Sequence, residues 1–136
     1  MKKFLFKGVA TALATPFTKT GVNFDEFKKF IDIQINSGIN ALVVCGTTGE
    51  ASTMTLEEKI ETIKCAVLAC NKRVPVIIGT GSNNTKTAIQ NSKMAENLGA
   101  DGLLIVTPYY NKTTQLRINW TLQINCKFCF FTYYFV

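Results

Sequence analysis

The chain has 136 residues, of which 47% are hydrophobic and none is histidine. This length favours one compact domain with enough apolar material for a core. Without histidine, nucleophile systems that need an imidazole base are excluded, and so are His-ligated metal sites. The net charge is +6, from 15 basic and 9 acidic residues. Because the lysines are scattered and few arginines occur, nucleic-acid binding is not indicated.

Composition changes sharply near residue 115. Residues 1–115 contain all 9 acidic residues and all 9 glycines of the chain. Residues 116–136 contain neither, and they hold 7 of the 15 aromatic residues. We therefore divide the chain into a body, residues 1–115, and an unmatched tail, residues 116–136, which is expected to be frameshifted or disordered.

The sequence indicates a cytoplasmic protein. Lys7 interrupts the apolar N-terminal run, so a first strand is favoured over a signal peptide. No stretch of 18 apolar residues occurs, so no membrane-spanning helix is predicted. The five cysteines follow no disulfide-framework spacing, which favours a reducing compartment. Cys126 and Cys129 form a single C-x-x-C, a weak signal, and no metal site is predicted.

Four short apolar runs rich in β-branched residues predict strands at 8–14, 41–45, 74–78 and 102–106. Helical spacing follows the first three runs. Capping-box spacing is present at residues 23–26 and 55–58, and a third helix is predicted from about 85 to 98. The side chains expected to face the core are Phe27, Phe30, Ile31 and Ile35 in the first helix, Ile60, Ile63, Val67 and Leu68 in the second, and Ala88, Ser92 and Ala95 in the third.

Apolar strands that alternate with amphipathic helices indicate an α/β protein with parallel strands buried on both faces. An open doubly wound sheet and a (β/α)₈ barrel both fit this pattern. Turns rich in Thr, Gly and Pro follow the strands at 15–17, 46–50, 79–82 and 107–111. Both architectures build their sites at these carboxyl ends. No glycine-rich dinucleotide or Walker motif is present, so nucleotide binding is unsupported.

The segment Gly46-Thr47-Thr48-Gly49-Glu50 has the composition of an anion-binding turn. Its glycines allow backbone N–H groups to point at a ligand, and its two hydroxyls can bind a carboxylate or relay a proton. The alternative is a tight turn with a capping threonine. Tyr109 and Tyr110 offer a phenol as a proton carrier at the same end of the strands, or else they are packing residues.

Two ordered motifs, Gly46-Thr-Thr-Gly-Glu50 and Val106-Thr-Pro-Tyr-Tyr-Asn111, with Gly79-Thr-Gly81 between them, carry a resemblance. Over about residues 6–115 the chain resembles the pyruvate-dependent class I aldolase and lyase family. Within that family it is most similar to the dihydrodipicolinate synthase group, which the double threonine favours. The resemblance implies a TIM barrel that condenses pyruvate with L-aspartate 4-semialdehyde through a Schiff base, in lysine and diaminopimelate biosynthesis. It implies no cofactor and a homo-oligomer.

The resemblance also implies roles for individual residues. Thr47 matches the hydroxyl of a proton relay, and Thr48 matches the group that binds the pyruvate carboxylate. Tyr110 matches a relay tyrosine that the family contributes across a subunit interface, with Tyr109 beside it. In members under lysine feedback, residues at the positions of Asn83 and Tyr109 line the inhibitor site.

Several family features have no counterpart in the 136 residues. The imine-forming lysine lies on the family's sixth strand, and a second relay tyrosine and an arginine belong to the fifth. We therefore expect an incomplete barrel of about four β/α units, truncated before the imine lysine and inactive alone. Lys112 is expected to be a surface residue. Ala51 and Thr87 replace residues of lysine-regulated members, so this regulation is not implied.

The tail has two explanations. After Gln115 the family continues with Gly-Leu at the start of a helix, whereas this chain continues with Leu116-Arg-Ile-Asn-Trp120. Codons AGG-ATT-AAT for Arg-Ile-Asn give Gly-Leu when the frame is shifted by one, so we expect a frameshift. Alternatively the chain is a genuine short protein whose tail evolved for packing or for a partner. For the function, one alternative is a non-catalytic assembly fragment that pairs with intact subunits through Tyr109 and Tyr110. Another pyruvate aldolase, of the N-acetylneuraminate lyase or 2-keto-3-deoxygluconate aldolase type, is a further alternative.

Overall fold

The computed structural model describes residues 5–112, 114–128 and 132–135, with side chains described up to residue 124. Five parallel strands form the main sheet, in the order β1 (Ala10–Ala12), β4 (Ala41–Val44), β5 (Val76–Gly79), β6 (Gly102–Ile105) and β7 (Thr132–Phe135). Four helices connect them: α1 (Phe24–Asn36), α2 (Leu56–Cys70), α3 (Thr85–Asn97) and α4 (Gln115–Phe128). The four predicted strands and the three predicted helices are confirmed.

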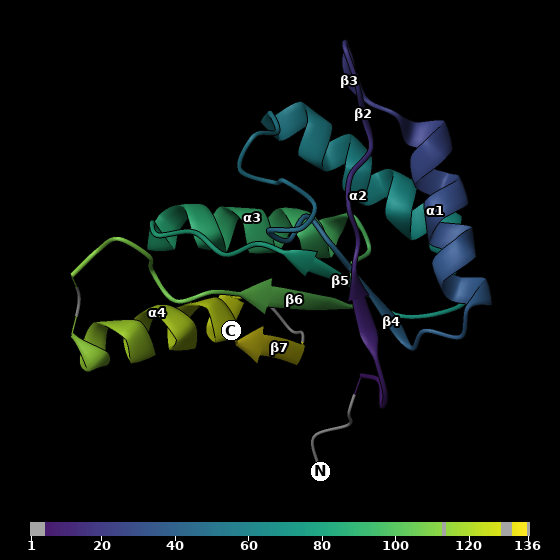
Figure 1. The fold of residues 1–136 in the computed structure, drawn as a ribbon. Coiled ribbons are helices and arrows are strands. Elements are labelled where there is room, and N and C mark those ends of the chain that lie inside the picture. The colour runs from purple at the N-terminus through teal and green to yellow at the C-terminus, as the bar shows by residue number, and fades with distance from the viewer. Residues whose placement is uncertain (1–4, 113, 129–131, 136) are drawn as a thin grey trace.

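The order of the strands distinguishes between the two architectures that the sequence left open. Each strand pairs with the next strand of the main sheet along the chain, without reversal. A doubly wound sheet reverses its strand order at a switch point, whereas a barrel does not. Neighbouring helices also contact one another in chain order, α1 with α2, α2 with α3 and α3 with α4 (Figure 1). This is the singly wound arrangement of a (β/α) barrel wall.

Side-chain caps fix the starts of the helices. Thr55 and Glu58 form the complete capping box predicted for α2: the Thr55 hydroxyl accepts from the Glu58 N–H at 3.1 Å, and the Glu58 carboxylate accepts from the Thr55 N–H at 2.8 Å. In α1 only half of the predicted box forms. Asn23 Oδ1 accepts from the Glu26 N–H at 3.2 Å, but the Glu26 carboxylate instead accepts from Lys29 Nζ at 2.7 Å.

A small hairpin that the sequence analysis did not predict lies between β1 and α1. Strands β2 (Phe17–Thr18) and β3 (Gly21–Val22) pair antiparallel, and Gly21 has φ of 135°. Only glycine adopts such a φ readily, so this residue allows the turn. Strands of two residues are too short to give an alternating pattern, which explains why the sequence analysis predicts only a turn at residues 15–17 and no hairpin after it.

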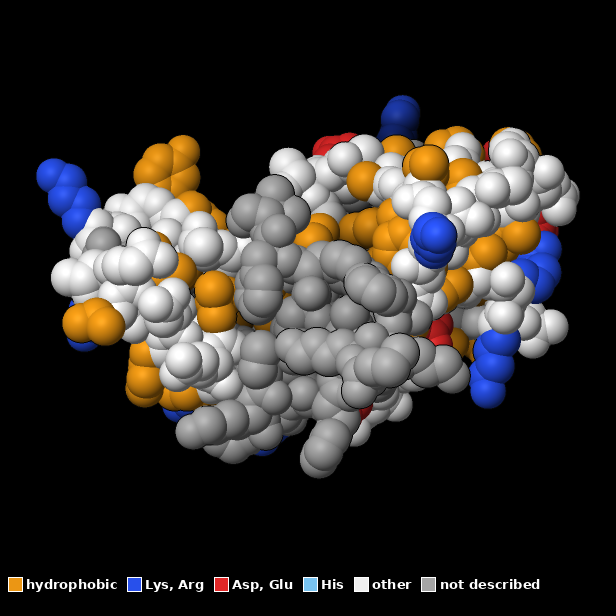
Figure 2. Space-filling view, turned by 90° about the horizontal axis from the view of Figure 1, so that it is seen from below, with side chains coloured by type: hydrophobic (Ala, Val, Ile, Leu, Met, Phe, Trp, Pro, Cys, Tyr) orange, Lys and Arg blue, Asp and Glu red, His pale blue; other side chains and the backbone are white. Residues whose placement is uncertain are grey.

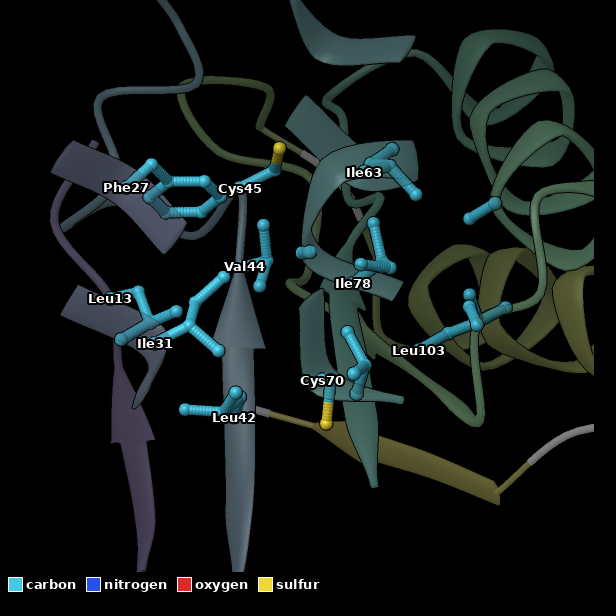
Figure 3. Packing of buried hydrophobic residues seen from close by; sticks show 14 of the residues in the cluster. Leu13, Phe27, Ile31, Leu42, Val44, Cys45, Ile63, Cys70, Ile78 and Leu103 are labelled. Carbon is cyan, nitrogen blue, oxygen red and sulfur yellow. The ribbon is translucent and has the colours of Figure 1, made fainter. Parts of the chain in front are cut away.

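One hydrophobic core lies between the sheet and the helices. In Figure 3 the side chains of α1 and α2 lie next to those of β4 and β5. The largest fully buried side chains are Phe27, Leu13, Ile31, Leu42, Ile63, Ile77, Ile78, Leu103, Ile105, Val44 and Thr62. The predicted core face of α3 is confirmed, because all three of its predicted residues are buried.

The core face predicted for α2 is wrong at Leu68, whose side chain is 77% exposed. The buried residues of this helix are Thr62, Ile63, Ala66 and Cys70. Leu68 was included because it adjoins Val67 in the apolar pattern of the helix. Its side chain lies outside the face of α2 that is buried.

The tail residues 116–128 form most of α4, and β7 pairs with β6. The division at residue 115 and the foreign origin of the tail remain predictions. Residues 129–131 and 136, and with them Cys129 of the C-x-x-C pair, lie outside the described residues.

In the described part of the chain, no helix is long and apolar enough to cross a membrane. On the face shown in Figure 2, Lys and Arg side chains stand apart from one another rather than in one patch.

Ile63 and Leu68 provide a matched pair for testing the packing of α2. Ile63 is 1% exposed and Leu68 is 77% exposed. Ile63→Ala should lower the free energy of unfolding by about 2–5 kcal/mol, because it leaves a cavity in the core. Leu68→Ala should change it by less than about 0.5 kcal/mol. Urea denaturation followed by circular dichroism measures both, and equal losses would contradict the placement of α2.

Candidate active site

The loop after β4 forms a tight turn with two strained residues beside its ends. Cys45 and Glu50 have φ of 55° and 54°, in the left-handed region that residues other than glycine seldom adopt. Backbone bonds close the turn, from the Gly49 N–H to the Gly46 carbonyl at 3.1 Å and from the Glu50 N–H to the Thr47 carbonyl at 3.0 Å. Strain of this kind is typical of functional loops.

Three glycines allow the ends of neighbouring strands to approach backbone to backbone. A Cβ on Gly79 would lie 2.2 Å from the Cys45 carbonyl oxygen, and one on Gly81 would lie 2.7 Å from the Val106 nitrogen. A Cβ on Gly49 would lie 3.1 Å from the Leu13 carbonyl oxygen. The loops after four strands are therefore held together at one edge of the sheet.

The buried Thr15 side chain fixes the same loop from β1. Its hydroxyl donates to the Gly49 carbonyl at 2.8 Å. This bond spans 34 residues of sequence and ties the first turn to the second. The hydroxyls of Thr47 and Thr48 stay exposed and make no hydrogen bond to another described residue. They are thus available to a ligand.

A cavity of about 380 Å³ opens where these loops meet α2 and α3. Thr47 and Tyr109 line it, whereas Thr48, Tyr110 and Asn83 do not. The full lining consists of Cys45, Gly46, Thr47, Ala51, Ser52, Lys59, Ile63, Ile78, Gly79, Thr80, Gly81, Ser82, Thr87, Asn91, Met94, Leu104, Val106 and Tyr109. Its volume is in the range of small-molecule sites.

Tyr109 and Tyr110 differ in their surroundings. Their rings pack edge to face with centroids 6.2 Å apart. Tyr109 is half exposed and turns one side toward the cavity, whereas Tyr110 is fully exposed and has φ of 60°. Asn83 lies in a second, smaller hollow with Asn111, whose Nδ2 donates to the Asn83 carbonyl at 2.7 Å. The structure therefore places Thr47 and Tyr109 in one cavity and leaves Tyr110 pointing into solvent.

Among the described residues that line the cavity, Cys45 carries the one thiol. Burial raises its pKa from 9.0 to about 11, and nearby Lys59 opposes this rise only in part. At neutral pH the group is therefore a thiol, which is a poor nucleophile. Cys45, Cys65 and Cys70 are free cysteines. No cluster of three or more potential metal ligands occurs in the residues that the structure describes.

Residues 5–120 match the Dihydrodipicolinate synthetase family. The chain belongs to this family. Over 111 residues it is 61% identical to 4-hydroxy-tetrahydrodipicolinate synthase 1 of Clostridium acetobutylicum, which covers 82% of this chain and 38% of that protein. The chain thus spans well under half the length of this relative. The family expected from the sequence motifs is confirmed.

Comparison with solved structures shows the fold of this family. The chloride-inhibited dihydrodipicolinate synthase of Acinetobacter baumannii, complexed with pyruvate, superposes with a TM-score of 0.91 at 40% identity over 94% of this chain and 44% of that chain. A monomeric dihydrodipicolinate synthase variant superposes with a TM-score of 0.94 at 34% identity over 96% of this chain and 44% of that one. The chain therefore has the fold of part of a TIM barrel, as expected.

Lys59 is the residue of this cavity that the sequence analysis missed. It lies in the first turn of α2 and is the only charged side chain among the described residues that line the cavity. In the sequence it is one lysine among several on an amphipathic helix, and no local signal distinguishes it. Its place beside Cys45 follows from the packing of α2 over the loop after β4.

Gly79 and Gly46 provide a test of the convergence of the loops. Gly79→Ala would force a Cβ to 2.2 Å from the Cys45 carbonyl oxygen, whereas a Cβ at Gly46 would meet only Val43 Cγ1, at 3.7 Å. Gly79→Ala should lower the free energy of unfolding by about 1–3 kcal/mol through overpacking. Gly46→Ala should cost less than about 1 kcal/mol. Thermal unfolding of both variants checks this, and a neutral Gly79→Ala would disprove the close approach.

Proposed function

We propose that this chain carries the pyruvate-binding and proton-relay half of a lyase that condenses pyruvate with L-aspartate 4-semialdehyde through a Schiff base. The observation that supports this most directly is the position of the Thr47–Thr48 turn at the carboxyl edge of the parallel sheet, with Thr47 on the cavity. Active sites of barrel enzymes lie at this edge. The family match and the printed name of the Clostridium acetobutylicum relative support the same reaction.

In this proposal the two threonines have different tasks. The Thr48 hydroxyl and N–H bind the carboxylate of pyruvate, since the hydroxyl is exposed and without a partner among the described residues. The Thr47 hydroxyl passes a proton between the substrate and a tyrosine. Hydroxyl and phenol groups are suited to this relay because each can donate and accept a hydrogen bond. No metal or cofactor takes part in the proposed reaction.

The imine-forming lysine is not among the residues of this chain that match the family pattern. The nucleophile of such a reaction must be an amine that attacks the ketone of pyruvate and forms the imine with loss of water. Lys112 is exposed, and it lies in the loop after β6 rather than at the end of a strand. We therefore propose that the 136-residue polypeptide alone does not turn over and that activity requires the missing lysine.

A second role, assembly, is supported by Tyr110. Its side chain is 100% exposed, and its backbone adopts the left-handed region at φ of 60°. A large aromatic ring held out in this way is suited to insertion into a neighbouring subunit. We propose that Tyr110 reaches the site of a second copy, in a cytoplasmic homo-oligomer. One solved relative is described as monomeric, so this contact is not shared by every family member.

A chimera tests the catalytic proposal. Residues 1–115 of this chain are fused to the remaining part of the Clostridium acetobutylicum relative, to which they are 61% identical over the aligned 111 residues. The chimera should condense the two substrates. Thr48→Val should raise KM for pyruvate about tenfold by removing a hydrogen bond to a charged group, and Thr47→Val should lower kcat by about 100-fold or more. Thr20→Val, in the exposed β2–β3 turn, is the control and should leave the kinetics unchanged. If Thr47→Val and Thr48→Val also leave the kinetics unchanged, the assignments are refuted.

Borohydride trapping tests the absence of the imine-forming lysine. The purified 136-residue chain is incubated with pyruvate and sodium borohydride, which reduces an imine to a stable amine. We expect no covalent adduct by mass spectrometry, while the chimera acquires one on its grafted lysine. A stoichiometric adduct on the 136-residue chain would overturn the proposal that it is inactive alone.

A further inference from the structure

The main sheet has two open edges. Among the described residues, its first strand, β1, pairs only with β4, and its last strand, β7, pairs only with β6 (Figure 1). All five strands are parallel, so the two edges run in the same direction. We propose that a second copy of the chain closes this sheet, with β1 of each copy paired to β7 of the other. This contact involves none of the residues of the proposed reaction.

The backbone of β1 offers hydrogen-bonding groups to a further strand. The Leu13 N–H donates to the Val43 carbonyl of β4 at 2.9 Å. Since the backbone groups of successive residues in a strand point to alternate sides, those of Ala10 and Ala12 point away from β4. No described strand lies on that side of β1. An edge with unpaired N–H and C=O groups is a template for another strand.

The face of the sheet opposite the helices is apolar. Leu42 and Val44 belong to the core that the helices cover, so the alternating side chains of the same strand point to the other, inner face. The strand register extends this inner face across β1, β4, β5 and β6. Ala12 is exposed there, and Leu104 is half-buried. Apart from glycines, the residues of these strands on the inner face are Ala10, Ala12, Ala41, Val43, Ile77 and Leu104, none of them polar.

The two edges favour a second copy as the occupant, because each chain carries both halves of the contact. A twofold axis along the strands places β7 of one copy beside β1 of the other at two equivalent seams. The ring of ten strands, five from each copy, then has no open edge. The small side chains of Ala10 and Ala12 leave room for the sheet to turn at each seam.

The remaining part of a family barrel, on a separate polypeptide, fits these edges less well. Its first strand would have to pair with β6 to continue the barrel. In this chain β7 already pairs with β6, from Gly102 opposite Thr132 to Ile105 opposite Phe135. A separate polypeptide would therefore have to displace β7, whereas a second copy uses it.

Sedimentation equilibrium tests the stoichiometry. The variant Tyr110→Ser is used, because it removes the separate contact proposed for Tyr110. We expect a reversible equilibrium between monomers of 15.1 kDa and dimers of twice that mass, with no larger species, because the ring is closed. A monomer at every concentration, or a ladder of larger oligomers, would overturn the proposal. Loss of a wild-type dimer in Tyr110→Ser would also overturn it, while supporting the contact through Tyr110.

Two lysine substitutions separate the inner face from the rest of the surface. Ala12→Lys should weaken dimerisation about tenfold or more, because it encloses an ammonium in an apolar interface. Leu68→Lys adds the same charge at a position on α2 that is 77% exposed, and it should leave dimerisation unchanged. Both positions are exposed in one copy, so both variants should keep the circular dichroism spectrum of the parent chain. Equal weakening by the two variants, or none, would show that the inner face is not the interface.

Hydrogen exchange followed by NMR locates the seam. Protection of the Ala12 amide should increase with protein concentration, in step with the fraction of dimer. The Leu13 amide, which already donates to Val43, should be protected at all concentrations. Exchange at Ala12 that does not follow dimerisation would contradict pairing at this edge. Protection of Ala12 only when the remaining part of the Clostridium acetobutylicum relative is added would identify that polypeptide as the occupant and rule out the second copy.

Discussion

The site depends on the contact between the Cys45–Gly46 peptide and Gly79. Only glycine fits at position 79, because a Cβ there would lie 2.2 Å from the Cys45 carbonyl oxygen. Two similar approaches, at Gly49 and Gly81, link the ends of the neighbouring strands. The strands of a barrel tilt relative to its axis. Here the loops at their carboxyl ends approach one another at glycines, where backbone can lie against backbone. The cavity lies where this convergence meets α2 and α3.

Much of the fold could be predicted because its signals are local. The apolar strands, the capping box at Thr55 and the small-residue face of α3 all depend on residues within one or two turns of each other. Exposure of Leu68 could not be predicted, since helical spacing shows which residues share a face but not how wide the contact is. The β2–β3 hairpin was missed because two-residue strands have no periodicity.

Prediction of the site was partial for a similar reason. The Thr47–Thr48 turn carries its own signal in its glycines and hydroxyls, and Thr47 indeed lines a cavity. Lys59 carries no such signal, because its place in the cavity lining arises only when α2 and the loop after β4 come together. The strand order could be settled only by the pairing of strands that are about 30 residues apart. Contacts of this range are set by the whole chain rather than by any segment.

The electrostatics of the cavity depend on Cys45 and Lys59, which both line it. A thiolate at Cys45 would neutralise the ammonium from within the protein. Burial, however, raises the Cys45 pKa to about 11, and the attraction of Lys59 does not offset this effect. The thiol therefore stays neutral at physiological pH, and none of the described residues that line the cavity carries a negative charge opposite to that of Lys59. Lys59 is therefore the side chain that sets the charge of the cavity among the described residues that line it.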